Sequence, residues 1–524
     1  MKEKINNKEK NLFKFIQNND LDFPFETSRF LGLSEKNNEK EEKNREKNAK
    51  QSHKKIENNK KIKNTENLLV KKVVKLRKKI SKKADQIERK NEKRINKCND
   101  FLLDDDPEYR ETYLTIDKFN TNGKKTVVYF IDSFYPVIDG VVSVLDNYAT
   151  YMQKYYNVVI CCPKHKNKTF KSEKYFVLAS DSLYVKNQGY DLGFPQLDLV
   201  FQKLISLLKI DLIHVQSPFN MGNFGVSLAK KRKIPCLATF HSQFKQNFQN
   251  AVKNEPLATL LTRIVMGIYQ RSTVAVTMNS FARNLMKEYG LKKQVELIPN
   301  ATNLKPKQFD EKFERDLLKK HKIDKDKFNI IFIGRFVEVK NVYFILDSII
   351  ELYKINKDFN FIFLGYGPEQ NKMQKICKEN GLENIVKFTG KIDSEDEKAI
   401  LIKNSNLLFF PSVYDTDGIV RIECACYSVP TLCIEETGVA SSLKDNVNGY
   451  IEKYSKEAFA KRMDVLIKNK EETKQVGERA FKEIYITWEG VCEKLFNLYE
   501  ETLKNFLTKE IKKKSKNKNA KTEK

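Results

Sequence analysis

The chain has 524 residues and a formal net charge of +27, because 96 Lys and Arg residues outnumber 69 Asp and Glu residues. This length exceeds what one hydrophobic core holds and predicts two domains with additional segments. No run reaches the roughly 18 uninterrupted apolar residues that cross a bilayer, and the basic start lacks the apolar stretch of a secretory signal. These features exclude a membrane-spanning helix and favour a cytoplasmic chain that could lie against the inner face of the cell membrane.

The excess positive charge lies at the two ends of the chain. Residues 1–100 contain 30 basic and 16 acidic side chains, and residues 508–524 contain 8 and 2. The two ends therefore hold 20 of the 27 net charges, which leaves an ordinary balance between them. We expect residues 1–100 to form a basic low-complexity or helical extension, residues 101–123 a linker and residues 508–524 a basic tail.

One part of the extension has a helical pattern. Apolar residues recur every three or four positions there, and lysines fill much of the remainder. The apolar positions are Leu69, Val73, Leu76 and Ile80. A basic amphipathic helix of this kind binds anionic lipid, pairs with another helix or binds RNA. An ordinary solvated helix explains the pattern equally well.

The nine cysteines are scattered without the paired spacing of a metal site. Four of them lie inside apolar runs, namely Cys161, Cys162, Cys236 and Cys433. We interpret them as reduced core residues of a cytosolic protein, and we expect no bound metal.

Between the two ends, short apolar runs alternate with helical patterns. Continuous runs of Val, Ile, Leu and Phe are typical of a parallel sheet that is buried on both faces. The first set of runs is TVVYFIDS, NVVICCP, DLIHVQSP, CLATFHS, TVAVTMN and VELIPN, and the second is NIIFIGRF, NFIFLGYG, VKFTGKI, LLFFPSV and TLCIEE. We therefore expect an α/β fold of two doubly wound, Rossmann-like domains, residues 124–305 and 306–487, that face a central cleft.

Residues that follow the runs of the first domain are candidates for a ligand site, because open α/β sheets bind ligands beyond the carboxyl ends of their strands. Gly140 opens a helix, where its lack of a side chain lets a ligand approach free backbone N–H groups. His241 follows the run CLATF. Simpler explanations exist: Gly140 as an ordinary turn residue, and His241 as a polar residue whose hydrogen bonds are satisfied.

In the second domain, two cations follow the first run. Arg335 and Lys340 lie in GRFVEVKN, where the fork of Arg and the point charge of Lys could clamp a diphosphate. They could equally be solvated surface charges. The turn at Gly365 and Gly367, after the next run, is too short for a dinucleotide-binding fingerprint.

A later segment, DTDGIVRIE, places an acid on each side of a helix start. Asp415 lies in the loop, residues 416–418 carry free N–H groups, and Glu423 follows one to two turns into the helix. A helix N-terminus favours phosphate, and carboxylates accept hydrogen bonds from sugar hydroxyls, so this set suits a nucleotide sugar. Alternatively, Asp415 caps the helix and Glu423 is a solvated surface residue.

The order of these motifs resembles the retaining glycosyltransferases of family 4, which have the GT-B architecture, over about residues 124–500. The matching segments are FYPVIDGVV, HVQSPF, ATFHS, IPNATN, GRFVEVKN, GYGPE, VKFTG and PSVYDTDGIVRIECACYSVPT. The resemblance implies transfer of a hexose, of glucose type, from a nucleoside diphosphate sugar such as a UDP-sugar, without a metal or another cofactor. It also implies a C-terminal helix, residues 488–507, that crosses back onto the first domain.

The resemblance also implies roles for individual residues. Gly140 would lie beside the donor phosphates and the acceptor, and His241 beside the transferred sugar, while the two cations would bind the diphosphate. The implied catalytic residues are His241, Asp415, Arg335 and Lys340. The implied donor-binding residues are Gly140, Gly334, Arg335, Lys340, Gly365, Asp415, Thr416, Asp417, Gly418, Ile419 and Glu423.

Three departures from the family pattern limit which properties of the family can be expected of this chain. Asp415 matches the first acid of the family's E-x7-E element, which holds the sugar, and Glu423 matches the second, which holds the ribose. The first acid is Asp rather than the commoner Glu, so its reach is shorter and the family's sugar preference does not transfer. PNATN replaces the usual Pro-Asn-Gly turn, and the Glu common after VTMN is absent, since Ser280 is followed by Phe281.

The sequence leaves the acceptor open. Residues 244–271 mix apolar and basic side chains, which suits a membrane-surface helix and a lipid acceptor such as diacylglycerol or a glycolipid, but also an ordinary core-facing helix. The basic ends favour peripheral membrane association. A non-catalytic scaffold, a nucleic-acid- or membrane-binding protein and a nucleotide-sugar epimerase remain alternatives, although no specific nucleic-acid recognition motif accompanies the basic ends.

Overall fold

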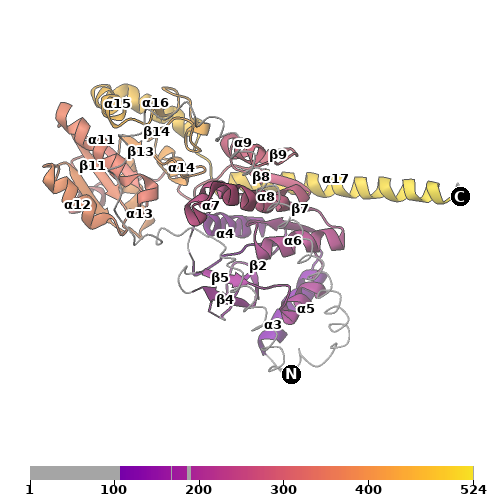
Figure 1. Cartoon of the computed structure of the whole chain (residues 1–524). Helices are drawn as coiled ribbons and strands as arrows, with labels where there is room; N and C mark the ends of the chain where they lie inside the picture. The colour runs from indigo at the N-terminus through magenta and orange to yellow at the C-terminus, as the bar shows by residue number, and fades with distance from the viewer. Residues whose placement is uncertain (1–106, 138, 167, 186–189, 523–524) are drawn as a thin grey trace, which may run out of the picture. The chain divides into compact units, whose positions relative to one another are not determined.

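The computed structural model describes residues 107–522 except 138, 167 and 186–189 (Figure 1). The basic extension over residues 1–100, with its predicted amphipathic helix, lies outside the described residues. Residues 244–262 form a unit of their own, which contains α7 (Phe244–Val252) and the first part of α8 (Glu255–Arg271). Within this unit, an ion pair of 3.1 Å joins Lys245 Nζ to Glu255 Oε1.

The first half of the chain contains a seven-stranded sheet in which every neighbouring pair of strands is parallel. The strand order is β3-β2-β1-β6-β7-β8-β9. All residues of the central strands β1, β2, β6 and β7 are buried, which explains their continuous apolar sequences. The strands are β1 (Thr126–Phe130), β2 (Asn157–Pro163), β3 (Phe176–Ser180), β6 (Leu212–Val215), β7 (Cys236–Phe240), β8 (Val274–Thr277) and β9 (Val295–Leu297).

Helices connect these strands, and β4 (Ser182–Val185) and β5 (Tyr190–Gly193) form a separate antiparallel pair. The helices are α3 (Pro107–Thr121), α4 (Gly140–Met152), α5 (Leu199–Leu207), α6 (Asn220–Arg232) and α9 (Ser280–Glu288). Side-chain caps start several of them. The carboxylates of Asp139 and Asp198 and the amide oxygen of Asn279 each accept a backbone N–H bond at the start of α4, α5 and α9.

The second half contains a six-stranded parallel sheet of order β12-β11-β10-β13-β14-β15. Its strands are β10 (Phe328–Ile333), β11 (Phe359–Leu364), β12 (Val386–Gly390), β13 (Leu407–Phe409), β14 (Thr431–Ile434) and β15 (Tyr450–Glu452). Its helices are α10 (Glu311–Lys320), η1 (Glu338–Lys340), α11 (Val342–Ile355), α12 (Gln370–Glu379), α13 (Glu395–Lys403), α14 (Ile419–Ala425), η2 (Ala440–Ser442), α15 (Lys456–Lys468) and α16 (Lys470–Glu483).

The predicted fold class, two doubly wound parallel α/β sheets, is confirmed, and each of the eleven apolar runs contains a strand.

Two segments differ from the prediction. Most of the expected linker, residues 101–123, is α3, which is tied to the first half because Asn120 Nδ2 donates a 2.9 Å hydrogen bond to the carbonyl of Leu207. The C-terminal helix does not end at position 507, because α17 (Trp488–Thr522) continues through the expected tail.

The first turns of α17 belong to the core of the first half. Trp488, Val491, Cys492, Leu495 and Tyr499 are buried in one cluster with apolar residues of α4, and α17 lies beside α4 (Figure 1). The Tyr499 hydroxyl contacts Nδ1 of His214, and the Thr239 hydroxyl lies 2.6 Å from its Nε2. Burial lowers the pKa of His214 to about 3, so this imidazole is neutral near pH 7.

Among the described residues, no helix combines the length and the apolar character that crossing a bilayer requires.

Candidate functional site

The predicted cation and acid that follow β10 and β13 meet in the structure. Lys340 Nζ lies 2.6 Å from Asp415 Oδ1, and both side chains are 20% exposed. Within the described residues, the second oxygen, Asp415 Oδ2, is buried and has no hydrogen-bond partner. A buried carboxylate oxygen without a donor is costly, so this oxygen is suited to accept a hydrogen bond from a ligand hydroxyl.

The predicted donor-site residue Gly365 is explained by the packing of its loop against the loop of Gly334. A Cβ on Gly365, whose φ is +141°, would lie 2.0 Å from the carbonyl oxygen of Gly334. Backbone hydrogen bonds join the same loops, from Gly334 N to the Leu364 carbonyl at 3.0 Å and from Phe336 N to the Tyr366 carbonyl at 2.9 Å. Close backbone approach therefore requires Gly365, whatever the loops bind, whereas a Cβ on Gly334 would meet only the Phe332 ring, at 3.2 Å.

Gly140 is the first residue of α4, and the charge of Arg335 acts on the residue that caps this helix. Asp139 caps α4 by accepting a 2.8 Å hydrogen bond from Val142 N. Burial raises the pKa of Asp139 above its ordinary value, although the backbone hydrogen bonds and the positive charge of Arg335 partly oppose this shift. Arg335 therefore lies within electrostatic range of the cap. A Cβ added at Gly140 would meet no atom of the described chain within 4 Å, so the space over this residue is open.

His241 follows β7, as predicted, and contacts a residue that sequence reasoning missed. Its Nε2 lies 2.8 Å from the amide oxygen of Gln216, which directly follows β6. This contact favours the tautomer that carries the proton on Nε2 and leaves Nδ1 as an acceptor. Burial lowers the pKa of His241 to about 4, so the ring is neutral near pH 7 and offers hydrogen bonds rather than charge.

Glu423 lines a pocket of about 190 Å³, and the other residues that line this pocket come from both halves of the chain. Its carboxylate forms a 2.6 Å ion pair with Lys398 of α13, a partner that the sequence analysis did not identify. Ile419, another predicted residue, lines the same pocket. The other lining residues are Ser143, Asn147, Ala301, Thr302, Asn303, Leu304, Glu395 and Trp488. Hydroxyl, amide and charged groups thus converge on a space open to a polar ligand.

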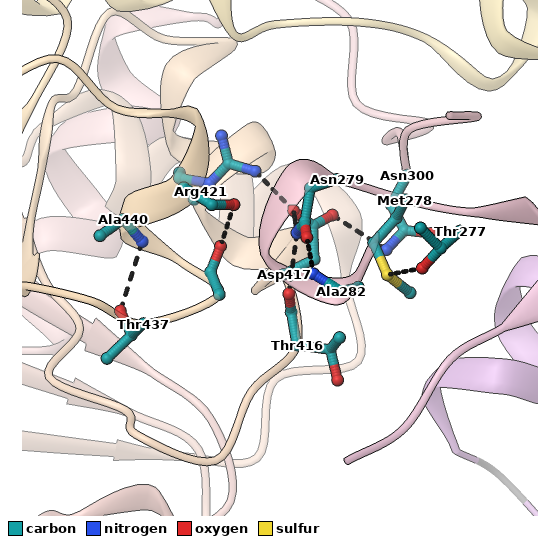
Figure 2. A network of polar contacts seen from close by, with 12 residues as sticks. Thr277, Met278, Asn279, Ala282, Asn300, Thr416, Asp417, Arg421, Thr437 and Ala440 are labelled. Atoms are coloured by element: carbon teal, nitrogen blue, oxygen red, sulfur yellow. Dashed lines mark hydrogen bonds and ion pairs between the residues drawn. The ribbon is translucent and has the colours of Figure 1, made fainter. Parts of the chain in front are cut away.

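The predicted N–H segment, Thr416 to Gly418, is held by side chains that the sequence analysis did not single out (Figure 2). Asp417 is buried, and its carboxylate accepts hydrogen bonds from Asn279 at 3.2 Å, from Asn300 at 2.9 Å and from Arg421 at 2.9 Å. Gly418 has a φ of +75° and precedes α14, which has only seven residues. The Asp417 side chain therefore anchors the segment.

The structure thus brings Lys340 and Asp415 into direct contact, while His241 and Glu423 have other partners, Gln216 and Lys398. The residues that the sequence analysis missed are several amides, Lys398 and Arg421, and the role of each depends on tertiary contacts. Their only sequence signal is position, since Gln216 and Asn279 follow β6 and β8 within two residues. Among the described residues, no group of three or more His, Cys, Asp and Glu could hold a metal ion.

Two family models match the chain. The model described as Glycosyltransferase Family 4 matches residues 138–305, and the model described as Glycosyl transferases group 1 matches residues 313–483.

Two curated relatives carry the same name, alpha-monoglucosyldiacylglycerol synthase. The protein from Acholeplasma laidlawii is 24% identical over 258 residues, which cover 46% of this chain and 63% of that relative. The protein from Streptococcus pneumoniae is 20% identical over 335 residues, which cover 61% of this chain and 73% of that relative. The chain therefore matches a little under two thirds of the length of the first relative.

Solved structures show the same fold. HepE of Anabaena, in complex with UDP, superposes with a TM-score of 0.57 at 14% identity and covers 72% of this chain and 100% of its own. Sucrose-phosphate synthase from Thermosynechococcus elongatus superposes with a TM-score of 0.57 at 15% identity, over 72% of this chain and 99% of its own.

Proposed function

The chain belongs to glycosyltransferase family 4, the hexosyltransferases with the GT-B architecture, and we propose that its donor is a nucleoside diphosphate sugar. The hexose is transferred to an acceptor hydroxyl with retention of the anomeric configuration. One observation carries this proposal most directly: Lys340 is paired with one oxygen of Asp415, and the other oxygen, buried without a partner in the described chain, is left for a sugar hydroxyl.

In the proposed mechanism, fixed cations stabilise the leaving group. When the bond between the anomeric carbon and the diphosphate breaks, negative charge builds on the phosphate oxygens. Lys340 and Arg335 supply positive charge where a divalent metal acts in other enzymes, so the reaction needs no metal and tolerates a chelator. His241, neutral and oriented by Gln216, contributes a hydrogen bond to the transferred sugar.

The donor is a UDP-sugar in this proposal, and Glu423 binds its ribose in the pocket that also contains Lys398. The support comes from HepE of Anabaena, which has been solved with UDP and with UDP-glucose. A donor screen by thermal shift, followed by the mass of the product, tests the assignment. We expect a UDP-hexose to raise the melting temperature and to yield an acceptor heavier by one hexose unit. If no nucleotide sugar raised the melting temperature, the result would contradict the donor assignment.

Gly140 offers a specific test of phosphate binding. Because a Cβ at this position meets no atom of the described chain, Gly140→Ala should fold normally, yet the methyl group would occupy space beside the proposed diphosphate. We expect the KM for the donor to rise roughly tenfold, as a misplaced ligand costs on the order of 1 kcal/mol or more. Gly490→Ala in α17, where a Cβ has its nearest neighbour at 3.7 Å, is the matched control. Equal donor KM values for both variants would remove Gly140 from the site.

The acceptor in this proposal is a membrane lipid, diacylglycerol or a glycolipid. Two curated relatives are named alpha-monoglucosyldiacylglycerol synthase, a name that contains a glucosylated diacylglycerol. The helix α17 also exposes Leu507 and Ile511, one turn apart and 61% and 67% accessible, among lysines. Residues 508–524 carry 8 basic and 2 acidic side chains, and each cation near anionic lipid contributes about 1 kcal/mol.

Vesicle flotation tests the membrane association. We expect the full-length protein to float with vesicles rich in anionic lipid at low salt and to be released at high salt, because the attraction is screened. Vesicles of neutral phosphatidylcholine are the control and should bind weakly. Absence of flotation with anionic vesicles at low salt would argue against a membrane-lipid acceptor.

A further inference from the structure

We infer that three amide side chains at one edge of the first sheet position the loop that carries Asp415. The three residues, Gln243, Asn279 and Asn300, are called the amide clamp, and residues 413–418 are called the donor loop. The inference rests on the proposed function, because it concerns how the donor-binding acid is held. In this inference the clamp residues are positioning residues that act through the loop.

The fold places the amide clamp at one edge. Gln243 follows β7 by three residues, Asn279 follows β8 by two, and Asn300 follows β9 by three. These strands are consecutive and parallel in the sheet, so their carboxyl ends lie side by side.

Each clamp residue donates a hydrogen bond into the donor loop. Gln243 Nε2 bonds to the carbonyl of Tyr414 at 2.9 Å, and Asn279 Nδ2 bonds to the carbonyl of Thr416 at 2.8 Å. Asn279 and Asn300 also bond to the carboxylate of Asp417, as Figure 2 shows. All three amides and Asp417 are more than nine-tenths buried, so water does not compete for these bonds.

The opposite side of the donor loop is fixed by the second half itself. A Cβ on Gly438 would lie 2.2 Å from the carbonyl oxygen of Thr416 and 2.7 Å from that of Asp415, so the loop backbone packs directly on this glycine. Arg421, in the first turn of α14, pairs with Asp417 at 2.9 Å. The loop is therefore enclosed by the clamp on one side and by backbone on the other.

The consequence concerns Asp415, which lies between two clamped residues. With the carbonyls of Tyr414 and Thr416 both held, the backbone of Asp415 has little freedom, and its carboxylate stays beside Lys340. Gln243 is also only two residues from His241. The clamp thus fixes the position of Asp415, the proposed sugar-binding acid of the second half, relative to His241 of the first half.

The decisive variant is Asn279→Ser. The amide oxygen of Asn279 caps α9 by accepting a 2.9 Å bond from Ala282 N, and Ser is an equally good cap, so the variant removes only the donor Nδ2. Asp417→Asn is a poorer choice, because it leaves the buried Arg421 without its counter-charge and threatens folding. Asn360→Ser is the matched control: Asn360 is equally buried, and its Nδ2 donates to Asn329 and Asp324.

Two readouts on the full-length protein test the inference. In the ligand-free protein, we expect Asn279→Ser to speed hydrogen exchange in the peptide that covers residues 413–418 by about tenfold. With the donor found in the screen, we expect its KM to rise about tenfold and kcat to fall, while the acceptor KM stays within twofold. Asn360→Ser should change neither readout, even where it lowers the melting temperature.

Each outcome has a separate meaning. Unchanged loop exchange and donor KM in Asn279→Ser, or equal changes in Asn360→Ser, would overturn the clamp. If the wild-type protein bound no nucleotide sugar, the proposed function would fail, yet the exchange data on the ligand-free protein would still decide whether the amides hold the loop.

Discussion

Replacing Lys340 by Ala is expected to lower turnover with the preferred donor on the order of ten- to a thousandfold. In the structure Lys340 Nζ lies 2.6 Å from Asp415, at the place proposed for the diphosphate. Its loss removes charge that stabilises the leaving group, and it also leaves the half-buried Asp415 without its counter-charge. The measurement is kcat with saturating donor, since a cation that acts as the leaving group departs affects the chemical step.

The control for this variant is another lysine that pairs with an aspartate. Lys307 forms a 2.8 Å ion pair with Asp396, but both side chains are about half exposed. Exposed pairs contribute little, so Lys307→Ala should retain turnover within about twofold. A Lys340→Ala enzyme as active as Lys307→Ala would show that the cation does not contribute to leaving-group departure.

The second large effect is expected for Asp415→Asn, which keeps the shape of the side chain and removes its charge. Asp415 Oδ1 accepts from Lys340, and Oδ2 is the oxygen without a partner in the described chain. An amide has a single acceptor oxygen, so it serves either Lys340 or the sugar hydroxyl but not both. We expect kcat/KM for the donor to fall about ten- to a hundredfold, and Asp396→Asn, at the exposed pair, to leave it unchanged.

Combining the two substitutions distinguishes a shared site from two separate sites. Because Lys340 and Asp415 are in contact, the double variant should lose less activity than the product of the single losses. Multiplicative losses would mean that the two residues act independently, which the proposed arrangement does not allow.

The fold was predictable because burial on both faces leaves a simple trace in the sequence. Each central strand is buried throughout and therefore mostly apolar, as β1 and β10 are, and such runs are visible without any tertiary information. The meeting of Lys340 and Asp415 follows from the same logic. These residues come after β10 and β13, which are neighbours in the sheet, so the ends of the two strands bring them together.

The amide clamp and the partners of the predicted residues were not predictable in this way. Gln216, Asn279 and Lys398 act through contacts with residues distant in sequence, and a single amide or lysine carries no periodic pattern. Asp417 was predicted to supply a backbone N–H group, whereas its side chain anchors the loop. The end of α17 was missed for a related reason, since a lysine-rich sequence suits a solvated helix as well as a tail.

The helix α17 has a consequence for biosynthesis. The residues that complete the core of the first half, from Trp488 to Tyr499, are translated after the entire second half. The nascent first half therefore emerges from the ribosome before the α17 residues that pack against α4 in the described structure, so this apolar face of α4 still lacks α17. It can finish folding only after the second half and the start of α17 have been translated, and until then chaperones can bind this surface or newly made chains can aggregate through it.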